Sequence, residues 1–351
     1  MKKYDIIIDM KNVENNNNKT LYENYTTKSS SLVFILALFL PSLVSSVIAL
    51  IVGVEKLSNN MWLYYTVLAL MQIVFFAIFY GYNKIGKYNI KKCSKINFNL
   101  NYKQILVIIL IALVSVFSFS PLVNLFQAVL KQMGFGAGSS EGVNKFLTSF
   151  GGLVLNIVVV GILPAICEEL VFRGVILNGF SKYKKWGMVM LSATMFMIMH
   201  MSINQSIYQL FLGIVLALVV IETGSIISSM ILHMTNNIVI LLSNYIYNIN
   251  GITPVGEYKF TVWNCIYPIL IAIVGVIAVI LLIKLLRYFT KQKNLKTNQI
   301  INDNETQSQI DNSLQDSPAT KIKGLDEKSS DIFWTCFGLV VGLVTWVISI
   351  L

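Results

Sequence analysis

Residues 164–174 read PAICEELVFRG and place two adjacent carboxylates and a guanidinium inside otherwise apolar sequence. A charged side chain at the centre of a bilayer costs about 2.5 to 3.5 kcal/mol or more on insertion scales. Glu168, Glu169 and Arg173 are therefore expected to face the interior of a helical bundle, where they find partners or take part in chemistry. This stretch marks the polar centre of the predicted fold.

The composition around this stretch is that of a polytopic membrane protein. Of 351 residues, 55% are apolar and 13% are charged, and the mean hydropathy is +0.68. A soluble domain has about 25% charged residues. A membrane-spanning helix needs about 20 apolar residues. The sequence therefore predicts an all-α membrane bundle of about eight core transmembrane helices plus one C-terminal transmembrane helix. The nine candidate spans are 31–54, 61–83, 104–126, 151–181, 186–203, 206–222, 224–248, 262–286 and 331–351.

The net charge of +10 is explained by membrane topology rather than by a nucleic-acid partner. Twenty-three of the 27 Lys and Arg residues fall in four segments, 1–30, 84–103, 168–186 and 284–330. These segments lie on the same side of the predicted spans, and basic residues favour the cytoplasmic side. We therefore expect a multi-pass protein of the cell membrane with a cytoplasmic N-terminus and contacts to anionic lipids.

The pattern of apolar and polar segments predicts six consecutive parts. The long polar stretches are typical of disorder, because they cannot bury enough apolar surface to fold. The parts are a flexible cytoplasmic arm (1–30), N-terminal transmembrane helices with interfacial segments (31–149), a core that carries the charged stretch (150–248), an eighth span (249–286), a disordered cytoplasmic linker (287–330) and the C-terminal transmembrane helix (331–351).

The two histidines of the chain, His200 and His233, both lie inside predicted spans. If a hairpin turns at residues 181–185, Glu168 lies 13 residues before the turn and His200 lies 15 residues after it. At about 1.5 Å per residue, both are about 20 Å from the turn. His233 and Asn237 reach a similar depth in the next helix, so the four side chains are expected to meet in a cavity open to the cytoplasmic side.

Helical spacing separates the side chains into pairs. His233 and Asn237 are four residues apart and share a face, as do Glu169 and Arg173. Glu168 projects about 100° away from its neighbour. A glutamate beside a histidine can take a proton from water, and a histidine or asparagine can bind an oxyanion. Two histidines and a glutamate can equally hold zinc with an open position.

Three motifs in successive helices resemble one known family. EELVFR begins at Glu168, FMIMH joins Phe196 to His200, and HMTNN joins His233 to Asn237. Their pattern of EExxxR, FxxxH and HxxxN resembles that of the CAAX protease and bacteriocin-processing (CPBP, Abi) family of intramembrane endopeptidases, which includes type II CAAX prenyl endopeptidases. The resemblance covers residues 150 to 245, about a third of the chain.

The resemblance implies that 150–248 is the catalytic core of a peptidase. It implies that water is activated by Glu168 and His200, and that the oxyanion is stabilised by His233 and Asn237. Supporting positions would be Glu169, Arg173 and Phe196, the last as an aromatic wall. In a zinc enzyme the metal ligands would be Glu168, His200 and His233; otherwise no cofactor is expected.

The expected partners are membrane lipids and a peptide or membrane-protein substrate, such as a bacteriocin leader, a pheromone or a protein tail. Two other classes fit parts of the sequence. A non-catalytic membrane scaffold or bacteriocin immunity protein could use the same polar set to bind a peptide. A proton-coupled transporter could use buried Glu and His as a relay, although its inverted repeats are not evident.

Overall fold

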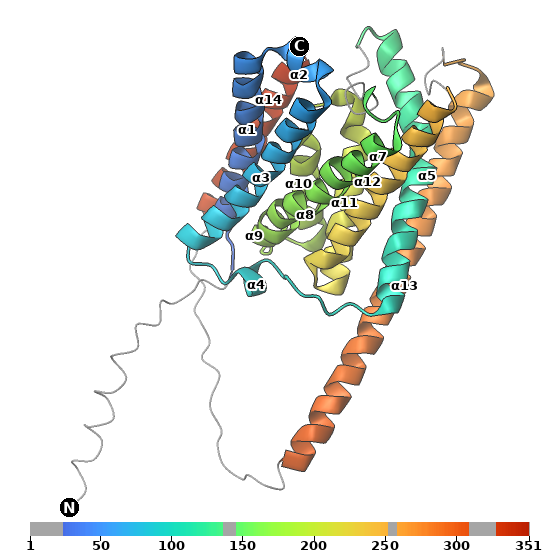
Figure 1. Ribbon diagram of the computed structural model, residues 1–351. Helices are drawn as coiled ribbons and strands as arrows, with labels where there is room; N and C mark the ends of the chain where they lie inside the picture. The colour runs from blue at the N-terminus through green and yellow to red at the C-terminus, as the bar shows by residue number, and fades with distance from the viewer. Residues whose placement is uncertain (1–23, 136–144, 252–257, 309–327, 351) are drawn as a thin grey trace, which may run out of the picture.

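The computed structural model describes residues 24–135, 145–251, 258–308 and 328–350 of the chain (Figure 1). Within these ranges every regular element is a helix and no β-strand occurs. The prediction of an all-α membrane bundle is confirmed.

Eight helices in the described ranges are long and apolar enough to cross a membrane, where nine spans are predicted. The difference is the predicted span 186–203. There the structure has α10 (Lys185–Met199), whose 15 residues reach only about 22 Å. Met201 ends it with a left-handed backbone, at a φ of 45°. The eight long helices are α1 (Thr27–Val52), α3 (Met61–Ile85), α5 (Tyr102–Gln132), the segment Phe150–Gly179, α11 (Ile203–Thr223), α12 (Ile226–Ile249), α13 (Val262–Ser308) and α14 (Lys328–Ile350).

The segment Phe150–Gly179 is not a uniform α-helix. Pro164 has no N–H with which to bond the carbonyl of Val160 one turn earlier, and this favours a break in the α-helical pattern. Two π-helical stretches interrupt the segment, and such stretches are rare and frequent at functional sites. The pieces in order are α7 (Phe150–Asn156), η1 (Ile157–Ile162), α8 (Leu163–Glu169), η2 (Leu170–Ile176) and α9 (Leu177–Gly179).

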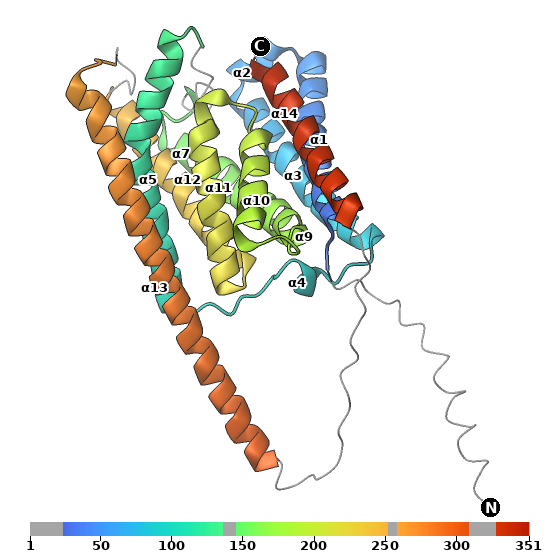
Figure 2. The same ribbon diagram turned by 180° about the vertical axis from the view of Figure 1, so that it is seen from behind.

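The helices form three groups across the bundle. α1, α3 and α14 lie on one side, α5 and α13 pair along the opposite side, and the helices from α7 to α12 lie between them (Figures 1 and 2). Two short helices, α2 (Val54–Asn59) and α4 (Ile90–Cys93), connect the long ones. α4, the turn between α9 and α10, and the extension of α13 all lie at one end of the bundle (Figure 1). The described parts of the basic segments are thus gathered at this end.

The start of the chain is packed earlier than predicted. The sequence predicts a flexible arm over 1–30, and the part before residue 24 lies outside the described residues. Tyr25, however, is buried, and its hydroxyl donates to Oδ1 of Asn83 on α3 at 2.6 Å. Ser30 is buried as well and donates to a carbonyl of η2 at 2.8 Å. Small hydroxyl side chains let α1 approach the central segment closely, so this part of the arm belongs to the bundle.

The disordered linker predicted for 287–330 also begins later than expected. α13 continues as a helix to Ser308, and it projects beyond the bundle (Figure 1). The sequence contains no Gly or Pro between Gly275 and Pro318, and Lys, Gln and Leu are good helix formers. The prediction is therefore wrong for the first 22 residues of the linker, and residues 309–327 lie outside the described part.

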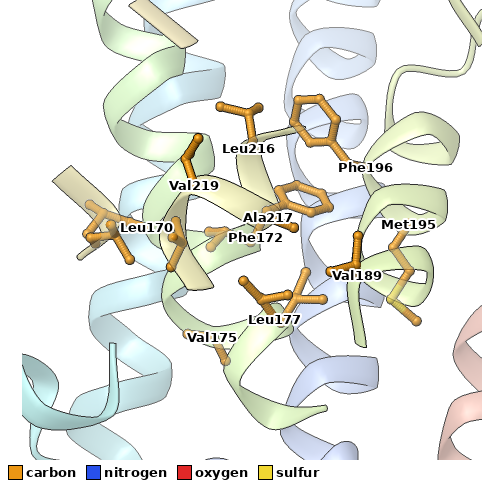
Figure 3. Close-up of a cluster of buried hydrophobic side chains, with 14 of the residues drawn as sticks. Leu170, Phe172, Val175, Leu177, Val189, Met195, Phe196, Leu216, Ala217 and Val219 are labelled. Atoms are coloured by element: carbon orange, nitrogen blue, oxygen red, sulfur yellow. The ribbon is translucent and has the colours of Figure 1, made fainter. Parts of the chain in front are cut away.

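The centre of the bundle is a close-packed apolar cluster. Helix association in a membrane relies on van der Waals contact and on small residues that let backbones approach. Gly213 shows this directly, because a Cβ placed there would lie 3.0 Å from Cα of Ala193. Figure 3 shows Phe172, Val175 and Leu177 of the central segment meeting Val189, Met195 and Phe196 of α10 and Leu216, Ala217 and Val219 of α11. This packing positions the charged stretch against α10 and α11.

Candidate functional site

The two adjacent carboxylates lie at the junction between α8 and η2. At the end of η2 the backbone N–H of Leu177 bonds the carbonyl of Phe172, which is the π-helical spacing. The side chain of Asn178 donates to the carbonyls of Arg173 at 2.7 Å and Gly174 at 3.0 Å. The amide of Asn178 therefore satisfies backbone groups that the change of helix type leaves without an α-helical partner.

Glu169 and Arg173 form a completely buried ion pair. Nη1 of Arg173 donates to Oε1 of Glu169 at 2.7 Å, and both side chains have 0% exposure. Nη2 of Arg173 donates to the carbonyl of Gly213 on α11 at 3.3 Å. Spacing of i and i+4 predicts this pair, and its burial satisfies the requirement that charges at this depth have internal partners.

The same carboxylate also holds His233. Nδ1 of His233 lies 3.0 Å from Oε1 of Glu169, and the imidazole is only 3% exposed. An ionised carboxylate can only accept, so the geometry assigns the Nδ1 proton to His233. Neutral His233 then presents Nε2 as an acceptor, and only the imidazolium form can donate from Nε2.

Phe196 is the aromatic wall of the site. Its ring centroid lies 4.3 Å from Cζ of Arg173, 4.8 Å from the ring of His200 and 5.8 Å from the ring of His233. The side chain is fully buried. One aromatic ring thus contacts the guanidinium and both imidazoles, and a cation over an aromatic face is attracted to it.

His200 lies where α10 ends. Its Nδ1 is 2.9 Å from the carbonyl oxygen of Phe196, and a carbonyl can only accept, so Nδ1 carries the proton. Nε2 is then available as an acceptor. His200 is half-buried and lies within electrostatic range of His233 and Arg173. The structure therefore brings both histidines to one site.

A chain of hydrogen bonds orients Asn237. The hydroxyl of Tyr208 on α11 donates to Oδ1 of Asn236, and Nδ2 of Asn236 donates to Oδ1 of Asn237 at 3.2 Å. Nδ2 of Asn237 points towards the carbonyls of Val160 at 3.4 Å and Gly161 at 3.5 Å, in η1. The half-buried Asn237 thus has its amide oxygen occupied and its donor group directed to the central segment.

Glu168 is bound differently from Glu169. It is 7% exposed and, within the described ranges, makes no ion pair. Its polar neighbour is the side chain of Gln72 on α3. Oε1 of Gln72 is buried and has no hydrogen-bond partner in the described part of the chain. Oε2 of Glu169 also lacks a hydrogen-bond partner in the described part of the chain, but it is fully buried. Glu168 therefore differs from Glu169 in having no ion pair and in being slightly exposed.

Sequence reasoning missed several polar residues of this site: Gln72, Asn178, Tyr208 and Asn236. Each is a polar side chain inside a long apolar run, which is the signal that marks Glu168. Each contacts a site residue, or a backbone carbonyl beside one, from a position that the motifs do not include. A search for uncharged polar residues within spans would have found them.

Zinc needs three protein ligands and an open position. In both histidines Nδ1 faces a carbonyl or carboxylate oxygen, and metal-bound histidines commonly have such a partner on the nitrogen that does not bind the metal. Among the residues that the structure describes, however, no three His, Cys, Asp or Glu side chains lie close enough together to share a metal ion. Glu168, His200 and His233 as arranged do not fit zinc.

Comparison with known families matches the part of the chain that builds this site. Residues 150–239 match the family model described as Rce1-like, type II CAAX prenyl endopeptidase. No curated protein and no solved structure matches the chain. The matched range starts at the first residue of α7 and contains the charged stretch, Phe196, His200, His233 and Asn237. The chain therefore carries a domain of the Rce1-like type II CAAX prenyl endopeptidase family.

Proposed function

We propose that the protein is an intramembrane endopeptidase that hydrolyses a peptide bond of a membrane-associated peptide or protein tail. One observation carries this proposal. Three motif residues from separate helices, Arg173, His200 and His233, meet around the ring of Phe196, and Glu169 bonds His233 directly. A retained polar network of this kind is costly in a membrane and favours chemistry over a purely structural role.

In the proposed reaction Glu168 is the general base. It takes a proton from water, and the oxygen of that water attacks the carbonyl carbon of the scissile bond. His200 accepts the second hydrogen of the water through Nε2 and so orients it. When the C–N bond breaks, Glu168 returns the proton to the leaving amine, and the products are a carboxylic acid and an amine.

The negative charge on the carbonyl oxygen needs donors. Nδ2 of Asn237 is a neutral donor, and in this proposal it exchanges its long bonds to the carbonyls of Val160 and Gly161, at 3.4 and 3.5 Å, for one to the oxyanion. His233 can donate from Nε2 in its imidazolium form, and the bond of its Nδ1 to Glu169 holds the ring in place. Arg173 and Phe196 take no part in bond making in this proposal; they hold Glu169 and both imidazoles.

The substrate class follows from where the site lies. A site formed by membrane-spanning helices meets chains that are in or at the bilayer, so a bacteriocin leader, a peptide pheromone or a membrane-protein tail fits better than a soluble protein. The basic segments at one end of the bundle support a cytoplasmic N-terminus and contact with anionic lipids.

The test uses the purified full-length chain in vesicles of phosphatidylethanolamine and phosphatidylglycerol. The probe is a mixture of synthetic peptides of varied sequence, each with an apolar anchor at one end, and mass spectrometry reads the products. We expect Glu168→Gln to lower the cleavage rate about 100- to 10,000-fold. Glu55→Gln, the same change at an exposed residue of α2, is the control and should cleave normally.

Equal cleavage by wild type and Glu168→Gln would contradict the proposal. Retention of a probe peptide by the vesicles without any cleavage would favour the scaffold or immunity alternative. Proton-driven uptake that survives Glu168→Gln would favour the transporter.

A further inference from the structure

α14 lies outside the matched family range, yet it packs along α1 and α10 (Figure 2). We propose that α14 is a positioning element of the candidate site, which docks on the back of α10 and fixes the end of α10 that carries His200. The catalytic meaning of this inference rests on the proposed function, whereas the docking itself does not.

The first contact lies at the end of the bundle where α10 begins. Lys182 pairs with Asp331, and the hydroxyls of Tyr183 and Thr335 share a hydrogen bond of 2.8 Å. Both partners on the α10 side belong to the turn just before that helix. α14 is therefore anchored at the start of α10 by polar groups that fix its register along the helix.

The second contact is a close approach in the middle of α14. A Cβ placed on Gly342 would lie 2.8 Å from the ring of Phe34 on α1 and 3.2 Å from Ile198 on α10. A Cβ placed on Gly338 would lie 3.1 Å from Ser31. Glycines four residues apart are a common device for close contact between helices in membranes. This face of α14 therefore fits the groove between α1 and α10.

The third contact lies next to His200. Oγ of Ser349, which donates to the carbonyl of Trp346 at 2.7 Å, also lies 3.4 Å from the carbonyl oxygen of Met201, the residue whose left-handed backbone ends α10. A residue with this conformation persists only where its surroundings hold it. The end of α14 thus lies against the turn that directly follows His200.

The contacts with α14 and with the site use opposite faces of α10. Gly342 faces Ile198, and Gly338 lies 3.4 Å, as measured from an added Cβ, from Met195. Phe196 and His200, four residues apart, share the other face and touch each other's rings. A change in how α14 packs against Met195 therefore shifts α10 as a unit, and with it Phe196 and His200 on the opposite face. In this way α14 is linked to the site without any direct contact.

The experiment exploits the fact that the chain has only two histidines. The full-length protein is labelled at histidine, and its two sets of ring signals are recorded by NMR in detergent and assigned with His200→Asn. We expect Gly342→Ile to shift or broaden the His200 signals and to leave the His233 signals, held by Glu169, less changed. Gly81→Ile is the matched control, because a Cβ at Gly81 meets nothing within 4 Å.

Unchanged His200 signals in folded Gly342→Ile would overturn the proposal. If that variant does not fold, the same NMR signals are recorded for Gly342→Ala, because a single methyl group displaces Phe34 and Ile198 less than an isoleucine side chain does. Where cleavage of the probe peptides is established, Gly342→Ile should lower kcat about 10- to 100-fold with KM little changed. Absence of cleavage by the wild type would contradict the proposed function, but the NMR result would still test the docking of α14.

A second measurement tests the docking alone. A Cβ on Gly338 lies 3.1 Å from Cβ of Ser31, close to the separation of about 3.5 to 4.5 Å in a disulfide. Oxidation of Ser31→Cys/Gly338→Cys should therefore remove two thiols from maleimide labelling, relative to either single variant. Full labelling of both introduced thiols after oxidation would contradict docked α14.

Discussion

Nδ1 of His233 lies 3.0 Å from Oε1 of Glu169, and the same oxygen accepts a hydrogen bond from Arg173 at 2.7 Å. A single carboxylate oxygen thus joins the central segment to α12. Glu168, one residue earlier, makes no ion pair among the described residues and has Gln72 as a polar neighbour. Substituting each carboxylate in turn should therefore show that Glu169 stabilises the fold and that Glu168 takes part in cleavage.

Glu169→Gln should destabilise the protein. The change leaves the guanidinium of Arg173 buried without a counter-charge, and breaking a buried ion pair in this way costs about 3 to 5 kcal/mol. We expect a lower unfolding temperature in detergent together with loss of cleavage. An unfolding temperature equal to that of wild type would show that the pair does not contribute to the fold.

Glu168→Gln should abolish cleavage without that loss of stability. Glu168 holds no positive partner, and an amide of the same size removes a buried charge and keeps hydrogen-bonding capacity towards Gln72. The unfolding temperature is expected to equal or exceed that of wild type. A decrease as large as that of Glu169→Gln would mean that the two carboxylates act as one structural unit.

Tyr208→Phe should weaken catalysis through Asn237. Loss of the hydroxyl leaves Oδ1 of Asn236 without its donor, at a cost of about 1 to 3 kcal/mol for a buried polar group. Asn236 is then free to turn, and Asn237 loses the contact that fixes its amide. We expect a lower kcat with KM little changed. Tyr80→Phe, at an exposed tyrosine of α3, is the matched control.

The sequence predicts those parts of the site that depend on spacing within a helix. The pair of Glu169 and Arg173 follows from i and i+4, while the equal depth of Glu168 and His200 stays a prediction. It could not predict that one oxygen serves both Arg173 and His233. That contact depends on how far α12 and the central segment rotate towards each other, which packing decides.

Other differences have equally specific causes. α10 stops at Met199 because the backbone of Met201 is left-handed. Residues 199–203 contain no Gly or Pro that would predict this. α13 continues through polar residues because composition alone cannot separate an exposed helix from a disordered segment. Tyr208 and Asn236 were missed because they act through Asn237, and not through a motif of their own.

Cleavage should persist in a metal chelator. The side chains of Glu168, His200 and His233 are not grouped for a shared metal ion, and a glutamate base with amide and imidazolium donors needs none. We expect purified protein to cleave the probe peptides equally with and without 1,10-phenanthroline, and elemental analysis to find less than one zinc per chain. Loss of cleavage in chelator, restored by added zinc, would contradict this mechanism.

Two glycines should respond in opposite directions to the same substitution. A Cβ on Gly179 would lie 2.5 Å from the backbone oxygen of Thr26 and closer still to Oγ of Ser30, at the contact between α9 and α1. A backbone atom cannot move aside, so Gly179→Ala should cost about 1 to 3 kcal/mol. A Cβ on Gly187, in α10, meets only Cβ of Tyr183 at an ordinary 3.6 Å.

Gly187→Ala should therefore be neutral or stabilising by about 0.5 to 1 kcal/mol, because alanine loses less backbone freedom in a helix. Thermal unfolding of both variants in one detergent gives the comparison. Because α10 carries His200, a stabilised Gly187→Ala variant that keeps full cleavage would also show that the start of this helix can be made more rigid without disturbing the site. Equal destabilisation by both changes would mean that α10 needs the freedom of a glycine near its first turn.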